Sequence, residues 1–419
     1  MTINCIIGSG IFGLPSVVAG LVGSASPFAW LFAAVATALI MACFAEVSSR
    51  FDQTGGVYLY ARTAFGRTTG IATAWVGWIT RLTAGAANAN LFVIYLSEFW
   101  PAAKNPIPRL LVLSVLLSVL TTVNYIGVRR GARQSDIFTA AKLVTLGGFI
   151  VAGLAFLIWN HRTPLVSLPT GPTTQWFRPI LLLLFAYGGY ETAMMPGGEA
   201  KNPRRDYPFA LFVALTTCTV VYTLTQVVII SVLPQPALSD RPMAAAVQAM
   251  VGARAGAVVS IGVLISCYGY LSANVLGFPR ILFAMAEHGD MPSVIAKVHP
   301  RFQTPYLAIV LFSILLYAFS IAGSFQWNVF VSAMARLIYY GSVAVALPVL
   351  RRKRGVPEAQ FQLPMGWLFA LLAAATSLLL FPRLDRAGLL VFAALAVGVI
   401  ANVLWASRRT RTTAAELGS

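Results

Sequence analysis

Long apolar stretches alternate with short polar connections along almost the whole chain. Most of these stretches reach the roughly 20 residues that an α-helix needs to cross a bilayer. The pattern predicts an all-α integral membrane protein with about 12 transmembrane helices. Their expected ranges are 2–21, 27–49, 69–99, 109–127, 137–159, 177–197, 208–233, 256–286, 305–322, 327–350, 365–381 and 387–406, followed by a polar and mobile tail, 407–419.

Glycines interrupt two of these helices, and each glycine weakens a helix by about 1 kcal/mol. The helix over 2–21 contains Gly8 and Gly10, and the helix over 177–197 contains Gly188 and Gly189. Close helix packing explains a single glycine pair, but these two interruptions open two successive sets of five helices. This placement predicts two broken helices with a binding site between them, as in transporters built from an inverted repeat.

Unwinding a helix inside a membrane frees backbone groups, which is tolerated only beside a cavity or a ligand. Free N–H groups at a helix N-terminus suit a carboxylate, whereas free carbonyl groups suit an ammonium or another cation. The two breaks therefore predict a site for a zwitterion such as an amino acid.

Composition narrows the class of protein further. Hydrophobic residues make up 58% of the 419 residues and charged residues only 10%, whereas soluble domains are about 25% charged. This excludes a disordered chain and an ordinary soluble domain. The cysteines are far apart and none forms a CxxC pair, so we expect neither a metal site nor another cofactor.

The net charge of +17 raises nucleic acid as a partner until the charges are placed on the expected helices. With a cytoplasmic N-terminus, 19 of the 30 Lys and Arg residues fall in inner connections, 8 in outer ones and 3 within helices. This bias predicts that both termini lie in the cytoplasm, and that the basic runs contact lipid headgroups rather than nucleic acid.

Ionisable residues within the expected helices are functional candidates by default. Lys142 either extends its ammonium to the membrane interface or takes part in ion coupling. Glu191 follows the second break and serves either gating and proton transfer or a structural hydrogen bond. We expect Arg81 to pair with a carboxylate or with free carbonyl groups.

Polar and aromatic side chains in the central helices are further pocket candidates. Asn88 and Asn274 either face a cavity or bridge two helices. Four tyrosines in central helices each adjoin a glycine or a small polar residue, which makes them better pocket candidates than the aromatic residues of the interface: Tyr187, Tyr190, Tyr268 and Tyr270.

Three motifs carry a resemblance to a known family: the segments 6–12, 198–205 and 277–286, the last continuing to Gly289 and Pro292. Residues 51–56 and Gly66 add a fourth. With these four motifs in this order along its sequence, the chain resembles amino-acid permeases of the amino acid–polyamine–organocation (APC) superfamily. The resemblance implies a 5+5 inverted repeat, with repeats at 1–159 and 177–350, two further helices within 365–406, and a cytoplasmic tail at 407–419.

The resemblance also implies roles for individual residues. Backbone amides around Ser9, Gly10 and Ile11 would hold the substrate carboxylate. The substrate ammonium would be held by carbonyl groups of the residues Ile6, Phe185, Ala186 and Gly188. Phe185 would be an aromatic gate, and Lys142 occupies a position where sodium-coupled relatives hold a cation.

Together these observations predict a secondary transporter that moves amino acids across the cell membrane by alternating access, coupled to protons or working as an exchanger. Because no carboxylate is placed to receive a cationic side chain, neutral L-amino acids are favoured. The alternative is a transporter of cationic amino acids, polyamines or another small amine or nucleobase. No catalytic motif supports an enzyme, and only about 10 Å of helix precedes Gly8, which suggests either an upstream start or a shortened inner gate.

Overall fold

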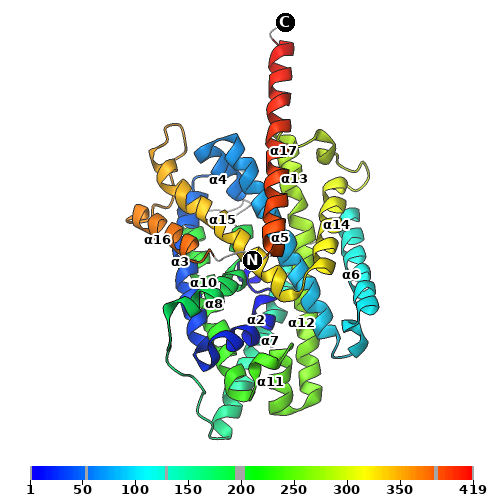
Figure 1. The fold of residues 1–419 in the computed structure, drawn as a ribbon, viewed down its shortest axis with the longest axis vertical. Helices are drawn as coiled ribbons and strands as arrows, with labels where there is room; N and C mark the ends of the chain where they lie inside the picture. The colour runs from blue at the N-terminus through cyan, green and yellow to red at the C-terminus, as the bar shows by residue number, and fades with distance from the viewer. Residues whose placement is uncertain (1, 52–54, 128–130, 194–202, 382–385, 418–419) are drawn as a thin grey trace.

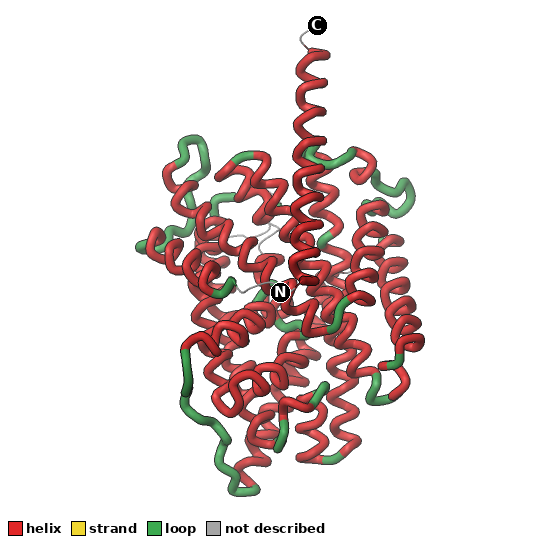
Figure 2. Tube along the Cα trace, in the orientation of Figure 1, coloured by secondary structure: helices red, strands yellow, loops and turns green. Residues whose placement is uncertain are grey.

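The computed structural model describes the chain except for residues 1, 52–54, 128–130, 194–202, 382–385 and 418–419. All regular elements of the described residues are helices, as Figure 2 shows. The motif over 198–205 therefore lies largely outside the described residues. The all-helical expectation is confirmed for the part that is described.

Most of the helices follow the expected apolar stretches closely. The α-helices are α1 Thr2–Ile6, α2 Gly10–Val22, α3 Ser26–Ser48, α4 Gly56–Phe65, α5 Arg67–Leu96, α6 Pro106–Ile126, α7 Gly131–Trp159, α8 Phe177–Tyr187, α9 Tyr190–Ala193, α10 Pro203–Val232, α11 Pro242–Val251, α12 Ala253–Gly277, α13 Pro279–Glu287, α14 Tyr306–Ala322, α15 Phe325–Arg352, α16 Gly366–Leu379 and α17 Arg386–Leu417.

Seven helical segments among the described residues are long and apolar enough to cross a membrane. They cover Gly10–Ser48, Pro106–Ile126, Ala140–Trp159, Pro208–Val232, Ala253–Glu287, Phe325–Arg352 and Arg386–Arg408. Shorter apolar helices, such as α14 and α16, complete the bundle. The count of about 12 spans remains a prediction.

The structure adds helices within the connecting segments. The polar tail continues α17 as a helix to Leu417 and projects beyond the other helices in Figure 1, and its mobility stays a prediction. The connections over 56–65 and 242–251 form the short helices α4 and α11. Each of these helices is followed by a glycine with positive φ, Gly66 after α4 and Gly252 after α11, and a glycine at such a place is typical of a turn.

The long helix α5 lies at the centre of the bundle. It packs against α15, α12, α14 and α4, and most of its residues are buried. On the outside, α6, α7 and α17 expose large apolar side chains, including Ile107, Val144 and Val397. An apolar outer surface is what contact with the hydrocarbon core of a bilayer requires.

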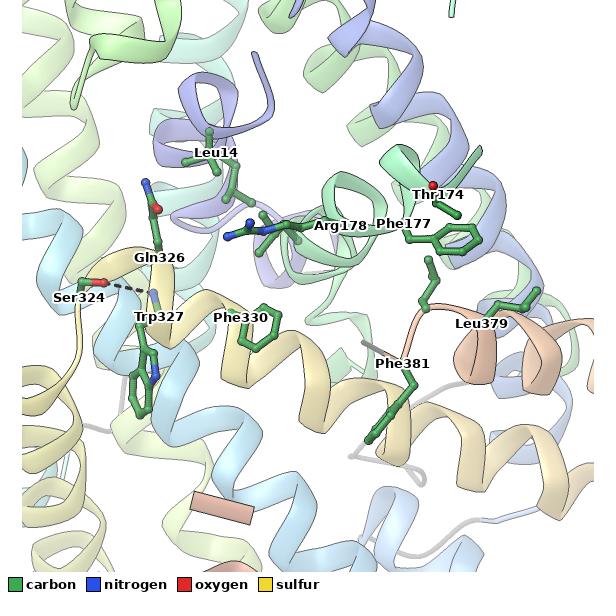
Figure 3. Close-up of a pocket in the computed structure, with 13 residues that line it drawn as sticks. Leu14, Thr174, Phe177, Arg178, Ser324, Gln326, Trp327, Phe330, Leu379 and Phe381 are labelled. Atoms are coloured by element: carbon green, nitrogen blue, oxygen red, sulfur yellow. Dashed lines mark hydrogen bonds between the residues drawn. The ribbon is translucent and has the colours of Figure 1, made fainter. Parts of the chain in front are cut away.

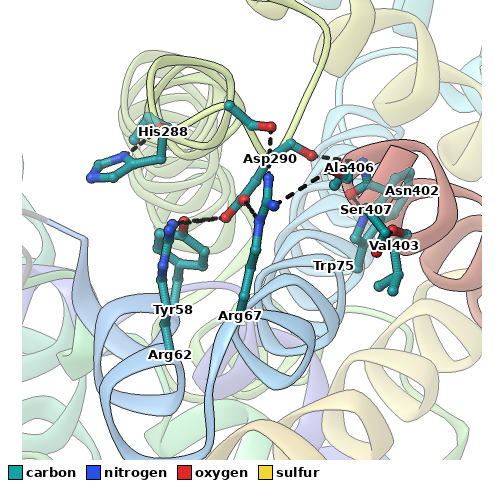
Figure 4. Close-up of polar contacts among 12 residues, drawn as sticks. Tyr58, Arg62, Arg67, Trp75, His288, Asp290, Asn402, Val403, Ala406 and Ser407 are labelled. Atoms are coloured by element: carbon teal, nitrogen blue, oxygen red, sulfur yellow. Dashed lines mark hydrogen bonds and ion pairs between the residues drawn. The ribbon is translucent and has the colours of Figure 1, made fainter. Parts of the chain in front are cut away.

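The carboxylate of Asp290 joins several elements at one end of the bundle (Figure 4). It accepts hydrogen bonds from Tyr58 Oη at 2.6 Å, Arg62 Nη1 at 2.9 Å and Arg67 Nε at 2.5 Å. The Asn402 side chain of α17 donates to the Asp290 carbonyl at 2.7 Å. This Asp290 cluster ties α4, α5 and α17 to the segment that follows α13.

A second carboxylate, Glu46, plays the same part for α3, α15 and α16. It accepts hydrogen bonds from Arg351 Nε at 2.7 Å, from Arg50 Nη2 at 3.3 Å and from the Leu363 amide at 2.9 Å. Glu46 is fully buried, so these donors are what makes its burial tolerable.

Candidate functional site

Both predicted helix breaks are present. α1 ends at Ile6 and α2 begins at Gly10, so residues 7–9 form the first break. α8 ends at Tyr187 and α9 begins at Tyr190, with Gly188 in extended conformation and Gly189 at φ +120°. A residue with a side chain would be strained at that φ.

The two breaks contact each other through these glycines. A Cβ at Gly10 would lie 2.6 Å from the Ala186 Cβ, and a Cβ at Gly189 would overlap the Cys5 carbonyl oxygen. The backbones of α2 and α8 therefore approach as closely as only glycine permits. The sequence places glycine where the two unwound segments meet.

A small cavity of about 10 Å³ lies between the breaks. It is lined by Ile6, Gly8, Ser9, Gly10, Asn88, Phe185, Ala186, Gly188, Tyr270 and Arg336. All the residues expected to bind substrate line it except Ile11, which is buried elsewhere along α2. A volume of this size holds about one water molecule, so the cavity is closed around its own side chains.

Arg336 occupies the space beside the second break. Its Nη1 atom lies where a Cβ of Gly188 would be, and its guanidinium lies 5.5 Å from the centre of the Phe185 ring. Nη1 also donates to Tyr340 Oη at 3.2 Å, whereas Nε has no hydrogen-bond partner in the part of the chain that the structure describes. Arg336 is 1% exposed, so a guanidinium with unused donors faces the cavity.

Glu191 is held by donors from three elements. Its Oε1 accepts from Arg81 Nη2 at 2.7 Å, and its Oε2 accepts from the Gly189 amide at 2.8 Å and from Tyr340 Oη at 3.1 Å. Arg81 also donates to Thr192 Oγ1 at 2.7 Å. Glu191 thus fixes the second break to α5 and α15, and the carboxylate partner expected for Arg81 is present.

Lys142 reaches the first break rather than the membrane interface. Its ammonium donates to the Ile7 carbonyl at 2.7 Å and to Asn4 Oδ1 at 3.0 Å, and the residue is 3% exposed. The unwound backbone supplies an acceptor that an intact helix would not offer. Lys142 is outside the cavity lining but directly contacts a residue of the break.

The polar pocket candidates separate into two groups. Asn88 lines the cavity, with its Oδ1 unpartnered, whereas Asn274 donates to the Arg81 carbonyl at 3.1 Å and bridges α12 to α5. Tyr187 donates to the Trp30 carbonyl at 3.1 Å and lies outside the lining, as does Tyr268. Tyr270, another of the tyrosine candidates, lines the cavity from α12.

Two residues of the site are not among the site residues expected from the sequence. Tyr222 of α10 donates at 3.4 Å to the carbonyls of both Ile6 and Ala186, bridging the two breaks. Arg336 is recognisable in the sequence only as a charge within an apolar stretch. That signal marks it as functional by default but does not place it beside Gly188.

A larger cavity of about 640 Å³ lies further along the same helices (Figure 3). Leu14 of α2, Leu182 of α8 and Phe330 of α15 line it, one to two turns from the small cavity. Arg178 points into it and is the single charged residue among those that line it. The two cavities are therefore both lined by residues of α2, α8 and α15.

The amino acid permease model matches residues 1–407 of the chain. The chain belongs to the amino acid permease family. This confirms the resemblance to the APC superfamily, and with its apolar helices the permease is a multi-pass membrane protein.

Named relatives of the permease are transporters. It is 27% identical to a serine/threonine exchanger of Bacillus subtilis (strain 168) over 90% of this chain and 87% of the relative. It is 26% identical to a methylthioribose transporter of the same strain, over 97% and 92%. The b(0,+)-type amino acid transporter 1 of Mus musculus is 27% identical over 92% and 81%. These similarities support an amino acid transporter.

Proposed function

We propose that this permease is a secondary transporter of amino acids that works by alternating access. The observation that carries the proposal is the closed cavity between two broken helices, lined by backbone groups of both breaks. A small site between the two breaks suits a ligand that approaches from either side in turn. The permease transports its substrate without covalent chemistry.

The two ends of an amino acid fit the two kinds of backbone group. The first N–H groups of α2, at Gly10 and Ile11, have no partner within their helix and suit the α-carboxylate. Carbonyls at the end of α1 and α8 suit the α-ammonium. Tyr222 Oη, which bridges the Ile6 and Ala186 carbonyls, occupies the position of such a donor.

We propose that the first helices of two inverted repeats, 1–159 and 177–350, move against a scaffold that includes α5 and α12. Helices 365–406 and the segment 407–419 lie outside the repeats. The inner position of most Lys and Arg residues supports a cell-membrane protein with both termini in the cytoplasm. The Glu46 and Asp290 clusters then lie at the cytoplasmic side.

Lys142 is the proposed coupling residue. Its ammonium on the Ile7 carbonyl links the charge of this lysine to the shape of the first break. Loss of a proton would remove the positive charge from this hydrogen bond and weaken it, which supports proton coupling. A permanently charged ammonium would serve an exchanger equally well. Glu191 and Phe185, at the second break, are the proposed gating residues.

The substrate side chain is not a cation in this proposal. Arg336 and Arg81 lie beside the cavity, and Glu191 is already engaged by three donors. A cationic amino acid, a polyamine or another small cation would meet these arginines without a free carboxylate. The neutral amino acids expected from the sequence satisfy this condition, and so do acidic ones.

Uptake by liposomes containing the purified permease tests the proposal. Uptake and exchange of a panel of labelled L-amino acids are measured with a pH gradient and again without one. We expect at least one amino acid to be taken up or exchanged. The proposal fails if correctly folded protein moves none of a full panel. Lys142→Ala tests coupling separately, because dependence on a pH gradient that survives this change removes the proton role of Lys142.

A further inference from the structure

The charges around the small cavity do not balance. Arg81 and Arg336 are both buried beside it, and Glu191 is the acidic residue that contacts them. Glu191 lies 2.7 Å from Arg81 but 4.0 Å from the Arg336 Nη1 atom. One carboxylate therefore serves Arg81, and among the described residues the guanidinium of Arg336 has no acidic group closer than this carboxylate, at 4.0 Å.

The hydrogen bonds lead to the same conclusion. Arg81 donates to Glu191 and Thr192, and its guanidinium lies 4.3 Å from the centre of the Phe278 ring. Arg336 has five N–H donors, yet its one hydrogen bond among the described residues is to Tyr340 Oη, at 3.2 Å. A buried cation with unused donors is unfavourable unless a partner arrives.

Other unpartnered groups lie at the same cavity. Ser9 Oγ and Asn88 Oδ1 are buried and have no hydrogen-bond partner among the described residues, and both residues line the cavity together with Arg336. A hydroxyl and a guanidinium can both donate to a carboxylate, and an amide oxygen can accept from an ammonium. These are the groups that a substrate with two carboxylates and one ammonium would use.

The neighbouring cavity has the same charge preference. Arg178 points into it, and no acidic residue lines it among the described residues (Figure 3). Charges of one sign in a low-dielectric cleft raise the local concentration of ligands of the opposite sign. A route through this cavity toward Arg336 favours an anion.

We propose that the substrate carries a second carboxylate, as an acidic amino acid does, and that Arg336 is the residue that binds it. This inference rests on the proposed function and specifies its substrate class. The zwitterionic part of the substrate lies on the two breaks. Its side-chain carboxylate pairs with the guanidinium, which compensates the charge left over when Arg81 takes Glu191.

Binding of L-glutamate and L-glutamine to the purified full-length permease tests this inference, with aspartate and asparagine as a second pair. Within each pair the ligands have nearly the same shape and differ in one negative charge. A charge-assisted hydrogen bond in the site predicts that at least one acid binds roughly tenfold to hundredfold more tightly than its amide. Equal affinities in both pairs, or tighter binding of the amides, would overturn the inference.

Variants separate the role of Arg336 from general effects on folding. Arg336→Gln should remove the preference for the acid, and Arg336→Lys should retain part of it because the charge remains. Arg254→Gln, at an exposed position of α12, is the matched control and should bind as the wild type does. If Arg336→Gln does not fold, the wild-type comparison still decides the substrate class.

The outcomes distinguish this inference from the proposed function. Uptake of neutral amino acids without a preference for acids overturns the acidic substrate but leaves amino acid transport intact. If folded wild-type permease neither binds nor moves any amino acid, both fall. Acid preference in the wild type that Arg336→Gln leaves unchanged overturns the role of Arg336.

Discussion

At the scale of single residues, the site depends on what glycine lacks. Gly10 lets the backbones of α2 and α8 touch, Gly188 leaves room for Arg336, and Gly189 adopts a φ of +120° against the Cys5 carbonyl. The sequence predicted the breaks because these glycines stand in otherwise apolar helices. It could not predict Arg336 as their neighbour, because residues 188 and 336 meet only in the folded bundle.

Gly189→Ala should destabilise the permease strongly. The added methyl group overlaps the backbone of Cys5 and is strained at a positive φ, which together should lower the free energy of unfolding by about 2 kcal/mol or more. Thermal unfolding in detergent measures the effect. Gly147→Ala in α7 is the control, since no atom lies within 4 Å of its added Cβ, and it should be neutral or stabilising by up to about 1 kcal/mol.

Glu191→Gln should also destabilise the protein, because it removes the carboxylate that lies 2.7 Å from Arg81 and leaves that guanidinium buried without its counter-ion. Breaking a buried ion pair costs about 3–5 kcal/mol. Asp240→Asn removes the partner of Lys104 in an exposed pair of similar length, 2.7 Å, and should cost about 1 kcal/mol or less. Equal losses of denaturant stability in the two variants would contradict the assigned role of Glu191.

At the scale of elements, long helices were predictable and short ones were not. The apolar stretches located α3, α5 and α15 to within a few residues, because a membrane helix needs a long apolar sequence. The expected helix over 256–286 divides into α12 and α13 before Pro279, which cannot donate a backbone hydrogen bond. α4 packs against α5 and α11 packs against α12. These contacts stabilise the two short helices, and they cannot be predicted from the local sequence.

The Asp290 cluster should hold α4 in place. Burial and the hydrogen bond to Asp290 raise the pKa of Tyr58 to about 12, so this hydroxyl stays a donor at physiological pH. Asp290→Asn removes the charge that Arg62 and Arg67 share. We expect amide hydrogen exchange in α4 to become about tenfold faster or more, while exchange in α14, which is outside the cluster, stays unchanged. Unaltered exchange in α4 would show that other contacts hold it.

At the scale of the whole molecule, the net charge of +17 reflects orientation more than binding. Most Lys and Arg residues belong to connections on one proposed side, which a count along the sequence could reveal. The balance of charge at the cavity was not predictable, because it depends on which arginine takes Glu191. In the folded protein Glu191 lies 2.7 Å from Arg81 and 4.0 Å from Arg336, so it pairs with Arg81.

Reporter fusions test the orientation. A green fluorescent protein fused after Leu417 should fluoresce, and alkaline phosphatase fused there should be inactive, because α17 ends in the cytoplasm in the proposed topology. Alkaline phosphatase inserted near Ser239, on the proposed outer side, should be active. The reverse pattern of the two reporters would invert the membrane orientation.

The closed cavity has a consequence for the direction of flux. Arg336 fills the space beside the second break, so the two breaks close around one of the permease's own side chains. A carrier that can close around its own side chain can return across the membrane without substrate, so it moves substrate without exchanging it for another molecule. We therefore expect net uptake into liposomes that contain no internal amino acid. Uptake that strictly requires a preloaded amino acid would contradict this expectation. The Arg336 guanidinium would then prevent the carrier from returning without substrate.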